Sequence, residues 1–146
     1  MKQNLVTRRQ ALLLKRLGFK DPCSTYMSRT SKEDAFGFLV TEAPCINHNT
    51  RWFLLSIPTV DEVIDWLRRK HNIIVYNAAE PYVDPIHPHI NFAFKVKTCD
   101  MQWGWNARKY LDRTKSSKNI YACKREAITI ALKYLCGSVA TSQRKV

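Results

Sequence analysis

The chain has 146 residues, of which 45% are hydrophobic and 11% aromatic, a composition that excludes an intrinsically disordered protein. Its 24 lysines and arginines outnumber its 12 aspartates and glutamates and give a net charge of +12. This excess points to an anionic partner: nucleic acid, a nucleotide or an acidic protein. The alternative is that the charge only keeps a small protein in solution.

The N-terminal segment MKQNLVTRRQALLLKRLGF has a run of three leucines that is broken by Lys15 and Arg16. This run is too short for the core of a signal peptide or for a membrane span, so we expect a cytoplasmic protein with no membrane partner. The length fits a single domain, which we place at residues 1–137, followed by a flexible basic tail at residues 138–146. The oligomeric state stays open, a homo-oligomer included.

The five cysteines show neither a CxxC pair nor any other close spacing, so the sequence indicates no disulfide framework and no zinc site. We expect buried, reduced thiols that pack as small hydrophobic side chains. A nucleophilic cysteine would need a neighbouring base, and the sequence singles none out. The cysteines are Cys23, Cys45, Cys99, Cys123 and Cys136.

Two capping boxes predict the starts of two helices, one formed by Thr7 with Gln10 and the other by Thr59 with Glu62. The second helix, within SIPTVDEVIDWLRRKHN, has its acidic residues in its first turns and the basic run RRK at its end. This charge order suits the helix dipole. We therefore assign the run RRK to helix stabilisation rather than to ligand binding.

Glycines predict the ends of two helices. Gly18 follows the first helix, expected at residues 8–17, and occupies the position of a left-handed C-terminal cap. Gly137 follows the last helix, expected at about residues 121–135.

Runs of aromatic and β-branched residues predict five strands. The second and third are expected to pair with each other, and the fourth and fifth to form a hairpin. The runs lie near residues 24–28, 36–40, 51–57, 73–78 and 89–97.

The fifth run, HINFAFKVK, alternates between apolar and other residues, which assigns one set of side chains to the core and the other to the outside. Residues 100–119 follow as a basic, polar connector. These elements predict an α+β fold: a single domain in which a small antiparallel sheet packs against about three helices. The core set is Ile90, Phe92, Phe94 and Val96, and the outer set is Asn91, Ala93, Lys95 and Lys97.

Asp84, His87 and His89 lie within six positions, in YVDPIHPHIN, and are potential metal ligands. The two histidines lie at the outer edge of the fifth strand, and Pro85 and Pro88 indicate an extended loop rather than a preformed cage. The sequence picks out no partner that would orient the two histidines. We therefore predict no metal site and expect the histidines to shape the loop or to contact an anion.

The chain contains none of the motifs GxSxG, GxxxxGK[ST], GxGxxG and HExxH, and it has four glycines in total. Its carboxylates gather at helix starts rather than in a cluster that could hold catalytic metal ions. We therefore predict a protein that is not an enzyme and needs no cofactor. A metal-dependent nuclease that uses His87 and His89 is the less favoured alternative.

Between Lys95 and Arg125, nine basic residues stand against two acidic ones, an excess of seven and more than half of the net charge. Trp103, Trp105 and Tyr110 are interleaved with them. Aromatic planes beside cations can stack on a base, although the tryptophans alternatively anchor a long connector to the core. The predicted anion- or nucleotide-binding residues are Lys95, Lys97, Trp103, Trp105, Arg108, Lys109 and Arg113.

Three segments of the chain, two of which contain the short motifs WLR and REA, are KRLGF, PTVDEVIDWLRRKHNIIVYN and CKREAITIALKYL. Their arrangement resembles that of short α+β proteins encoded by phages and mobile elements of gut anaerobic bacteria. These proteins have no established activity. The resemblance implies such an origin and an α+β fold, and it carries over no catalytic residue. The stretch from Asp100 to Asn119 departs from the arrangement.

These observations favour a non-enzymatic accessory protein of a phage or mobile element. It would bind and sequester an anionic partner, either a nucleotide signal or nucleic acid, in the host cytosol and so counteract a host defence. The alternative is a protein–protein inhibitor or interaction module whose target is an acidic host or phage protein.

Overall fold

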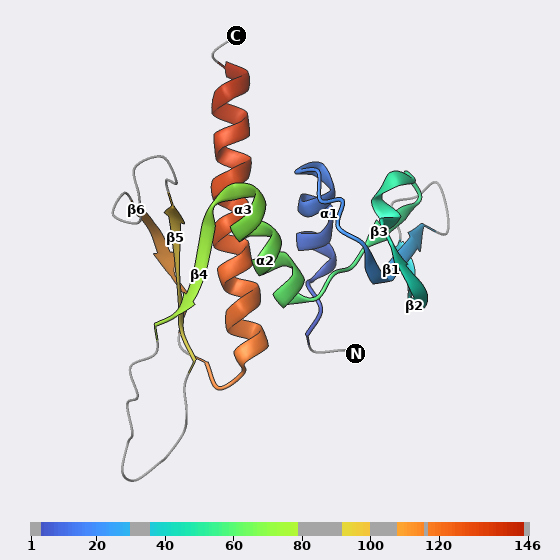
Figure 1. The fold of residues 1–146 in the computed structure, drawn as a ribbon, viewed down its shortest axis with the longest axis horizontal. Helices are drawn as coiled ribbons and strands as arrows, with labels where there is room; N and C mark the ends of the chain where they lie inside the picture. The colour runs from blue at the N-terminus through green and yellow to red at the C-terminus, as the bar shows by residue number, and fades with distance from the viewer. Residues whose placement is uncertain (1–3, 30–35, 79–91, 100–107, 116, 145–146) are drawn as a thin grey trace. The chain divides into compact units, whose positions relative to one another are not determined.

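The computed structural model describes residues 4–29, 36–78, 92–99, 108–115 and 117–144 (Figure 1). These residues form three α-helices and two three-stranded antiparallel sheets, so the predicted α+β class is confirmed, with the strands divided between two small sheets. The chain divides into two compact units, Met1–Glu62 and Val63–Val146. In chain order the elements are α1 (Arg8–Arg16), β1 (Cys23–Arg29), β2 (Phe36–Ile46), the 3-10 helix η1 (His48–Thr50), β3 (Leu54–Ser56), α2 (Val60–His71), β4 (Ile73–Asn77), β5 (Phe94–Cys99), β6 (Arg108–Arg113) and α3 (Ile120–Arg144).

In the first unit, β1 is the central strand of the sheet and pairs antiparallel with both β2 and β3 (Figure 1). The three predicted strands are confirmed, although β2 is longer and β3 shorter than expected. The predicted pairing between β2 and β3 is wrong. Residues 47–53 separate these two strands and include η1, a connection too long for a tight hairpin turn, and β3 lies instead on the other side of β1.

Helix α1 begins and ends as predicted. Thr7 Oγ1 accepts a hydrogen bond from Gln10 N at 3.2 Å, and Gln10 Oε1 accepts one from Thr7 N at 3.0 Å, which completes the capping box. At the other end Gly18 has a φ of +83°, and Phe19 N donates to Leu14 O at 2.9 Å, as in a Schellman turn. Because Phe19 and Leu14 are fully buried, the end of the helix is also part of the core.

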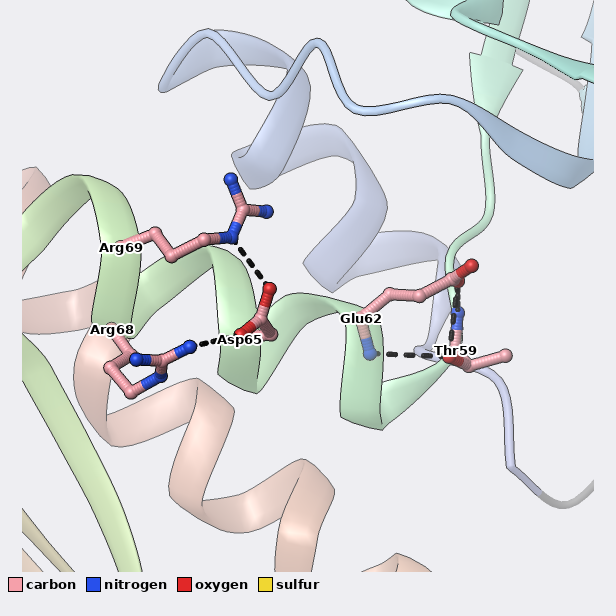
Figure 2. Close-up of polar contacts among 5 residues, drawn as sticks. All are labelled: Thr59, Glu62, Asp65, Arg68 and Arg69. Atoms are coloured by element: carbon pink, nitrogen blue, oxygen red, sulfur yellow. Dashed lines mark hydrogen bonds and ion pairs between the residues drawn. The ribbon is translucent and has the colours of Figure 1, made fainter.

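Helix α2 carries the second predicted capping box (Figure 2). Thr59 N donates to Glu62 Oε2 at 2.7 Å, and Thr59 Oγ1 accepts from Glu62 N at 3.2 Å. One turn further on, Asp65 accepts hydrogen bonds from Arg68 at 2.7 Å and from Arg69 at 2.6 Å. These two hydrogen bonds lower the pKa of Asp65. Arg68 and Arg69 are thus engaged within their own helix, in agreement with a stabilising role for the run RRK.

The second unit contains the sheet β4-β5-β6, with β5 at its centre. The predicted hairpin is confirmed: β4 and β5 pair antiparallel from Ile73 opposite Thr98 to Asn77 opposite Phe94. The prediction of a connector throughout residues 100–119 is wrong at β6. Its sequence, RKYLDR, lacks the hydrophobic alternation that marks a strand, and it becomes one because β5 supplies hydrogen-bond partners along its second edge.

Helix α3 packs on one side of this sheet, where it contacts β5 and β6 (Figure 1). Phe94 and Val96 of β5 are buried as predicted, and Cys123 Sγ donates to Phe92 O at 3.0 Å. The apolar side of the sheet therefore forms the core of the second unit with α3. The buried residues of α3 are Cys123, Ala127, Ile128, Ala131 and Leu132.

The alternation predicted for the fifth strand fails at its beginning. Ala93, assigned to the outside, is 1% exposed, and Phe92, assigned to the core, is half-buried. The reason is that β5 starts only at Phe94, and Phe92 forms an isolated bridge with Ser117 outside the regular strand. Ile90 and Asn91, which belong to the same prediction, lie outside the described residues.

Helix α3 does not end at Gly137, as the sequence predicts, but continues to Arg144. A glycine inside a helix costs only about 1 kcal/mol relative to alanine, and the following residues SVATSQR contain no proline. The helix therefore continues through Gly137. The prediction of a flexible tail over residues 138–146 stays a prediction.

Replacing Thr59 by Ala should lower the free energy of unfolding by about 1 kcal/mol, because Glu62 N then loses its capping acceptor. Chemical denaturation monitored by circular dichroism measures this change. Thr59→Ser keeps the hydroxyl group and should remain close to the wild type. Equal stability of all three proteins would contradict the capping role.

Replacing Gly137 by Ala should raise the free energy of unfolding by about 0.5–1 kcal/mol, since the change favours the helix and a Cβ there meets no atom within 4 Å. The matched change Gly18→Ala should destabilise the protein, because Gly18 has a φ of +83°. Thermal unfolding of both variants compares the two effects. A destabilised Gly137→Ala protein would show that the helix does not continue through this position.

Candidate functional site

The central strand β5 presents different chemistry on its two sides. Phe94 and Val96 are buried, whereas Lys95 and Lys97 between them are half-buried. Successive side chains of a strand point to opposite faces of a sheet, so the two lysines share the face opposite the buried side chains. This arrangement agrees with the outward orientation predicted for Lys95 and Lys97.

The register of the sheet brings aromatic and cationic residues from both edge strands to the lysines. Lys95 lies opposite Tyr76 of β4 and Arg113 of β6, and Lys97 lies opposite Tyr110 of β6. Residues directly opposite one another in an antiparallel sheet share a face. We call the surface formed by Tyr76, Lys95, Lys97, Tyr110 and Arg113 the basic face.

One contact within the basic face joins an ammonium group to an aromatic ring. Lys97 Nζ lies 5.2 Å from the centroid of the Tyr76 ring, within the range of a cation–π interaction. Lys97 is opposite Ile74 rather than Tyr76, so its side chain reaches diagonally across the sheet. The contact holds a cation and an aromatic plane together at the boundary between β4 and β5.

Within the described part of the chain, no carboxylate forms an ion pair with Lys95, Lys97 or Arg113. Asp112 lies opposite Val96, which assigns it to the other face, and its Oδ1 accepts from Arg113 N at 2.7 Å. The sequence of α3 contains one acidic residue, Glu126. Its Oε1 accepts a hydrogen bond from the backbone N–H of Lys115 at 3.2 Å. No described carboxylate therefore pairs with the cations of the basic face.

The basic face is open to solvent over much of its area. Tyr110 is 50% exposed, and Arg113 is also exposed. The unit that contains this face has fifteen basic and six acidic residues, a net charge of +9. The other unit, Met1–Glu62, has nine basic and six acidic residues, a net charge of +3. Most of the net charge thus belongs to the unit with the basic face, which raises the positive potential there.

Of the predicted binding residues, the structure brings Lys95, Lys97 and Arg113 together. Arg108 and Lys109 belong to β6, where they lie opposite Cys99 and Thr98. Trp103 and Trp105 lie outside the described residues, so their proposed stacking role stays a prediction.

Sequence reasoning missed Tyr76. It named Tyr110 among the aromatic residues interleaved with the basic stretch but did not include it in the predicted binding residues. Tyr76 lies nineteen positions before Lys95 in the chain and reaches the basic face only through the pairing of β4 with β5. The available signal was the predicted hairpin: aligning IIVYN against FKVKT in antiparallel register puts Tyr76 opposite Lys95. The position of Tyr110 opposite Lys97 had no comparable signal, because β6 was not predicted.

The metal candidates Asp84, His87 and His89 lie outside the described residues. Among the residues that are described, no group of three or more His, Cys, Asp or Glu side chains could hold a metal ion. Likewise, no helix in the described ranges is long and apolar enough to cross a membrane.

A cysteine and a histidine lie together in the first unit, a pairing that the sequence did not reveal. His48 Nε2 donates to Cys23 O at 3.1 Å, and Cys23 Sγ donates to Thr25 O at 3.3 Å. Burial raises the pKa of the Cys23 thiol, the opposite of what a nucleophilic cysteine requires. The histidine bonds to a carbonyl rather than to sulfur and stacks on Tyr26 with 4.2 Å between ring centroids. The pair therefore stabilises the junction of β1 and η1.

All five cysteines are free. Cys23, Cys99 and Cys123 are buried, which confirms the predicted packing role for these three. The prediction of burial is wrong for Cys45, which is exposed, and for Cys136, which is half-buried.

Comparison of the chain with protein-family models, with curated proteins and with solved structures finds no match.

Proposed function

We propose that the chain is a non-enzymatic protein that binds single-stranded nucleic acid on the basic face. The phosphates would contact Lys95, Lys97 and Arg113, and unstacked bases would lie on Tyr76 and Tyr110. Proteins that bind single strands combine such a cationic surface with aromatic side chains on which successive bases stack.

One observation carries this proposal: three cations and two tyrosines share one face of a sheet on which no described carboxylate lies. An ordinary solvent-facing surface intersperses both signs of charge. Here the described carboxylate of the sheet, Asp112, is assigned to the other side. The segregation of charge across the sheet thus favours a ligand that is negative along its length.

The spacing of the tyrosines favours an oligonucleotide over a single nucleotide. Tyr76 and Tyr110 lie on the two edge strands and in successive cross-strand rows, those of Lys95 and of Lys97. Standard strand spacing and rise then separate the two positions by roughly 12 Å. A single planar base cannot lie on both rings, whereas two bases of one strand can, with their phosphates over the lysines between them.

Stacking on tyrosine also favours single strands over duplexes. The bases of a duplex are stacked on one another and expose only their edges in the grooves. A ring on a sheet surface reaches the plane of a base only when the base is unstacked. Tyr110, 50% exposed on an edge strand, is available for such a contact.

The biological role proposed for this binding is sequestration. A protein encoded by a phage or mobile element, as the resemblance implies, would act in the host cytosol. By covering a single-stranded nucleic acid it would keep that strand from a host defence system that detects or degrades it. Sequestration needs affinity and no catalytic group, which agrees with the absence of catalytic motifs from the sequence.

Changing Lys95 and Lys97 together to Glu should abolish binding of a fluorescent single-stranded oligonucleotide without unfolding the protein, because the cations that meet the phosphates are reversed. Fluorescence anisotropy at fixed salt gives the affinity, and circular dichroism reports the fold. The control is Lys118→Glu with Lys133→Glu, two exposed lysines of the same unit that change the net charge equally. Equal loss in both proteins would mean that only the total charge matters.

Binding measurements on the wild-type protein with different ligands identify the ligand class. Tight binding of mononucleotides but not of oligonucleotides would identify a nucleotide signal as the ligand. Capture of an acidic protein, without affinity for either, would support the alternative of a protein–protein inhibitor. Either result would replace single-stranded nucleic acid as the ligand.

Replacing Tyr110 by Ala should weaken oligonucleotide binding by about 1–3 kcal/mol, the usual contribution of one stacked base, or roughly 5- to 150-fold. Tyr110→Phe retains the aromatic plane and should bind nearly as well as the wild type. Anisotropy titrations of the three proteins make the comparison. If Phe and Ala weaken binding equally, the hydroxyl group rather than the ring makes the contact.

A further inference from the structure

The most exposed large hydrophobic side chain among the described residues belongs to the first unit, whereas the basic face belongs to the second. Trp52 is 70% exposed and lies between η1 and β3. Leaving an indole this exposed forgoes the burial energy of a large aromatic side chain. A solvent-exposed tryptophan on a well-held segment therefore indicates a binding contact.

The backbone around Trp52 is a tight turn that an ammonium group holds closed. Leu54 N donates to Arg51 O at 3.2 Å, so Trp52 and Phe53 occupy the two central positions of the turn. Lys15 Nζ, from α1, donates to Arg51 O at 2.9 Å and to Leu54 O at 2.7 Å. One lysine side chain thus fixes both carbonyl groups that bracket the turn.

A second side chain fixes the segments on either side of the turn. Asn49 Nδ2 donates to Phe19 O at 3.1 Å, and Asn49 Oδ1 accepts from Ser56 N at 3.0 Å. The turn is therefore connected to the C-terminal end of α1 and to β3 by side chain to backbone hydrogen bonds. Such preorganisation reduces the entropy lost when Trp52 binds a ligand.

The chain neighbours of Trp52, Arg51 and Phe53, are cationic and aromatic. Arg51 is exposed, with its guanidinium carbon 5.9 Å from the Phe53 ring centroid, and the Trp52 and Phe53 rings meet edge to face at 5.7 Å. Residues 43–60 contain no acidic residue. A tryptophan plane next to a guanidinium group offers a stacking surface for a base and a contact for its phosphate.

We infer that Trp52 and Arg51 form a second contact for single-stranded nucleic acid, in which Trp52 stacks on a base and Lys15 acts as a positioning residue for the turn. This inference rests on the proposed function of the basic face. A nucleotide unit suits this site because its base can stack on the exposed indole while its phosphate meets the guanidinium group of Arg51, with no acidic residue among residues 43–60 to repel it.

The two contacts lie in different units of the chain. Under this inference a strand that occupies both should bind more tightly than one that occupies the basic face alone. The test uses oligothymidylates from three to thirty nucleotides and measures affinity by anisotropy at constant salt. Trp52→Ala should weaken binding of the long strands at least fivefold and leave binding of the trimer unchanged. Trp52→Phe should recover most of the loss.

Ile46→Ala provides the matched control. Ile46 is 50% exposed and belongs to the same unit, but it lies at the end of β2 rather than on the turn. Its replacement should leave the affinity for every strand length unchanged. Intrinsic fluorescence supplies an independent readout: a long strand should quench the emission of the wild type more than that of Trp52→Phe.

Lys15→Met tests the positioning role. The change removes both hydrogen bonds to the turn while keeping a long side chain, and it should weaken binding of long strands several-fold. In the Trp52→Ala background the same change should have no further effect, because there is no longer a ring to position. Additive effects of the two changes would show that Lys15 contacts the ligand or supports the fold by another route.

The outcomes separate this inference from the proposed function. If Lys95→Glu with Lys97→Glu abolishes binding but Trp52→Ala behaves as the wild type at all lengths, the second contact is refuted and the basic face stands. If Trp52→Ala weakens binding and the double lysine variant does not, the basic face is refuted and the turn is the binding site. If Trp52→Ala affects only the capture of a protein, the turn is a protein-docking site and the inference is overturned.

Discussion

The pairing of β5 with both β4 and β6 is the constraint on which the candidate site depends. Residues directly opposite one another in an antiparallel sheet share a face, so the register alone decides which side chains surround Lys95 and Lys97. In the observed register they are Tyr76, Tyr110 and Arg113. A slip by one residue in either pairing would send the tyrosine of that edge strand to the side of α3. Slips in both pairings would leave the lysines without an aromatic neighbour.

Buried apolar residues and half-buried lysines alternate along β5, so that one face of the strand stabilises the fold and the other is the proposed binding face. Phe94 and Val96 are buried in the core of their unit, and burial of such side chains contributes about 1.5–3 kcal/mol each. The lysines between them are half-buried and form no ion pair with a described carboxylate. Their charges therefore contribute little to the fold, and the same short strand can support the core on one face and attract an anion on the other.

The first unit follows a different principle, in which polar side chains hold irregular backbone in place. Lys15 binds two carbonyl groups of the turn at Trp52, and His48 binds the carbonyl group of Cys23. Partial burial lowers the pKa of Lys15, since desolvation disfavours its charged form. These hydrogen bonds from side chains to carbonyl groups hold the turn and the ends of the strands in place, and they fix the backbone that carries the exposed Trp52.

The sequence by itself determined the helix starts at Thr7 and Thr59 and the left-handed cap at Gly18, because capping depends on residues three or four positions apart. It also determined the α+β class and the outward orientation of Lys95 and Lys97, since both follow from local periodicity. Only the tertiary structure decided that β1 lies between β2 and β3, that RKYLDR becomes a strand, and that two tyrosines join the lysines. These features depend on contacts between segments far apart in the chain, for which a local pattern contains no information.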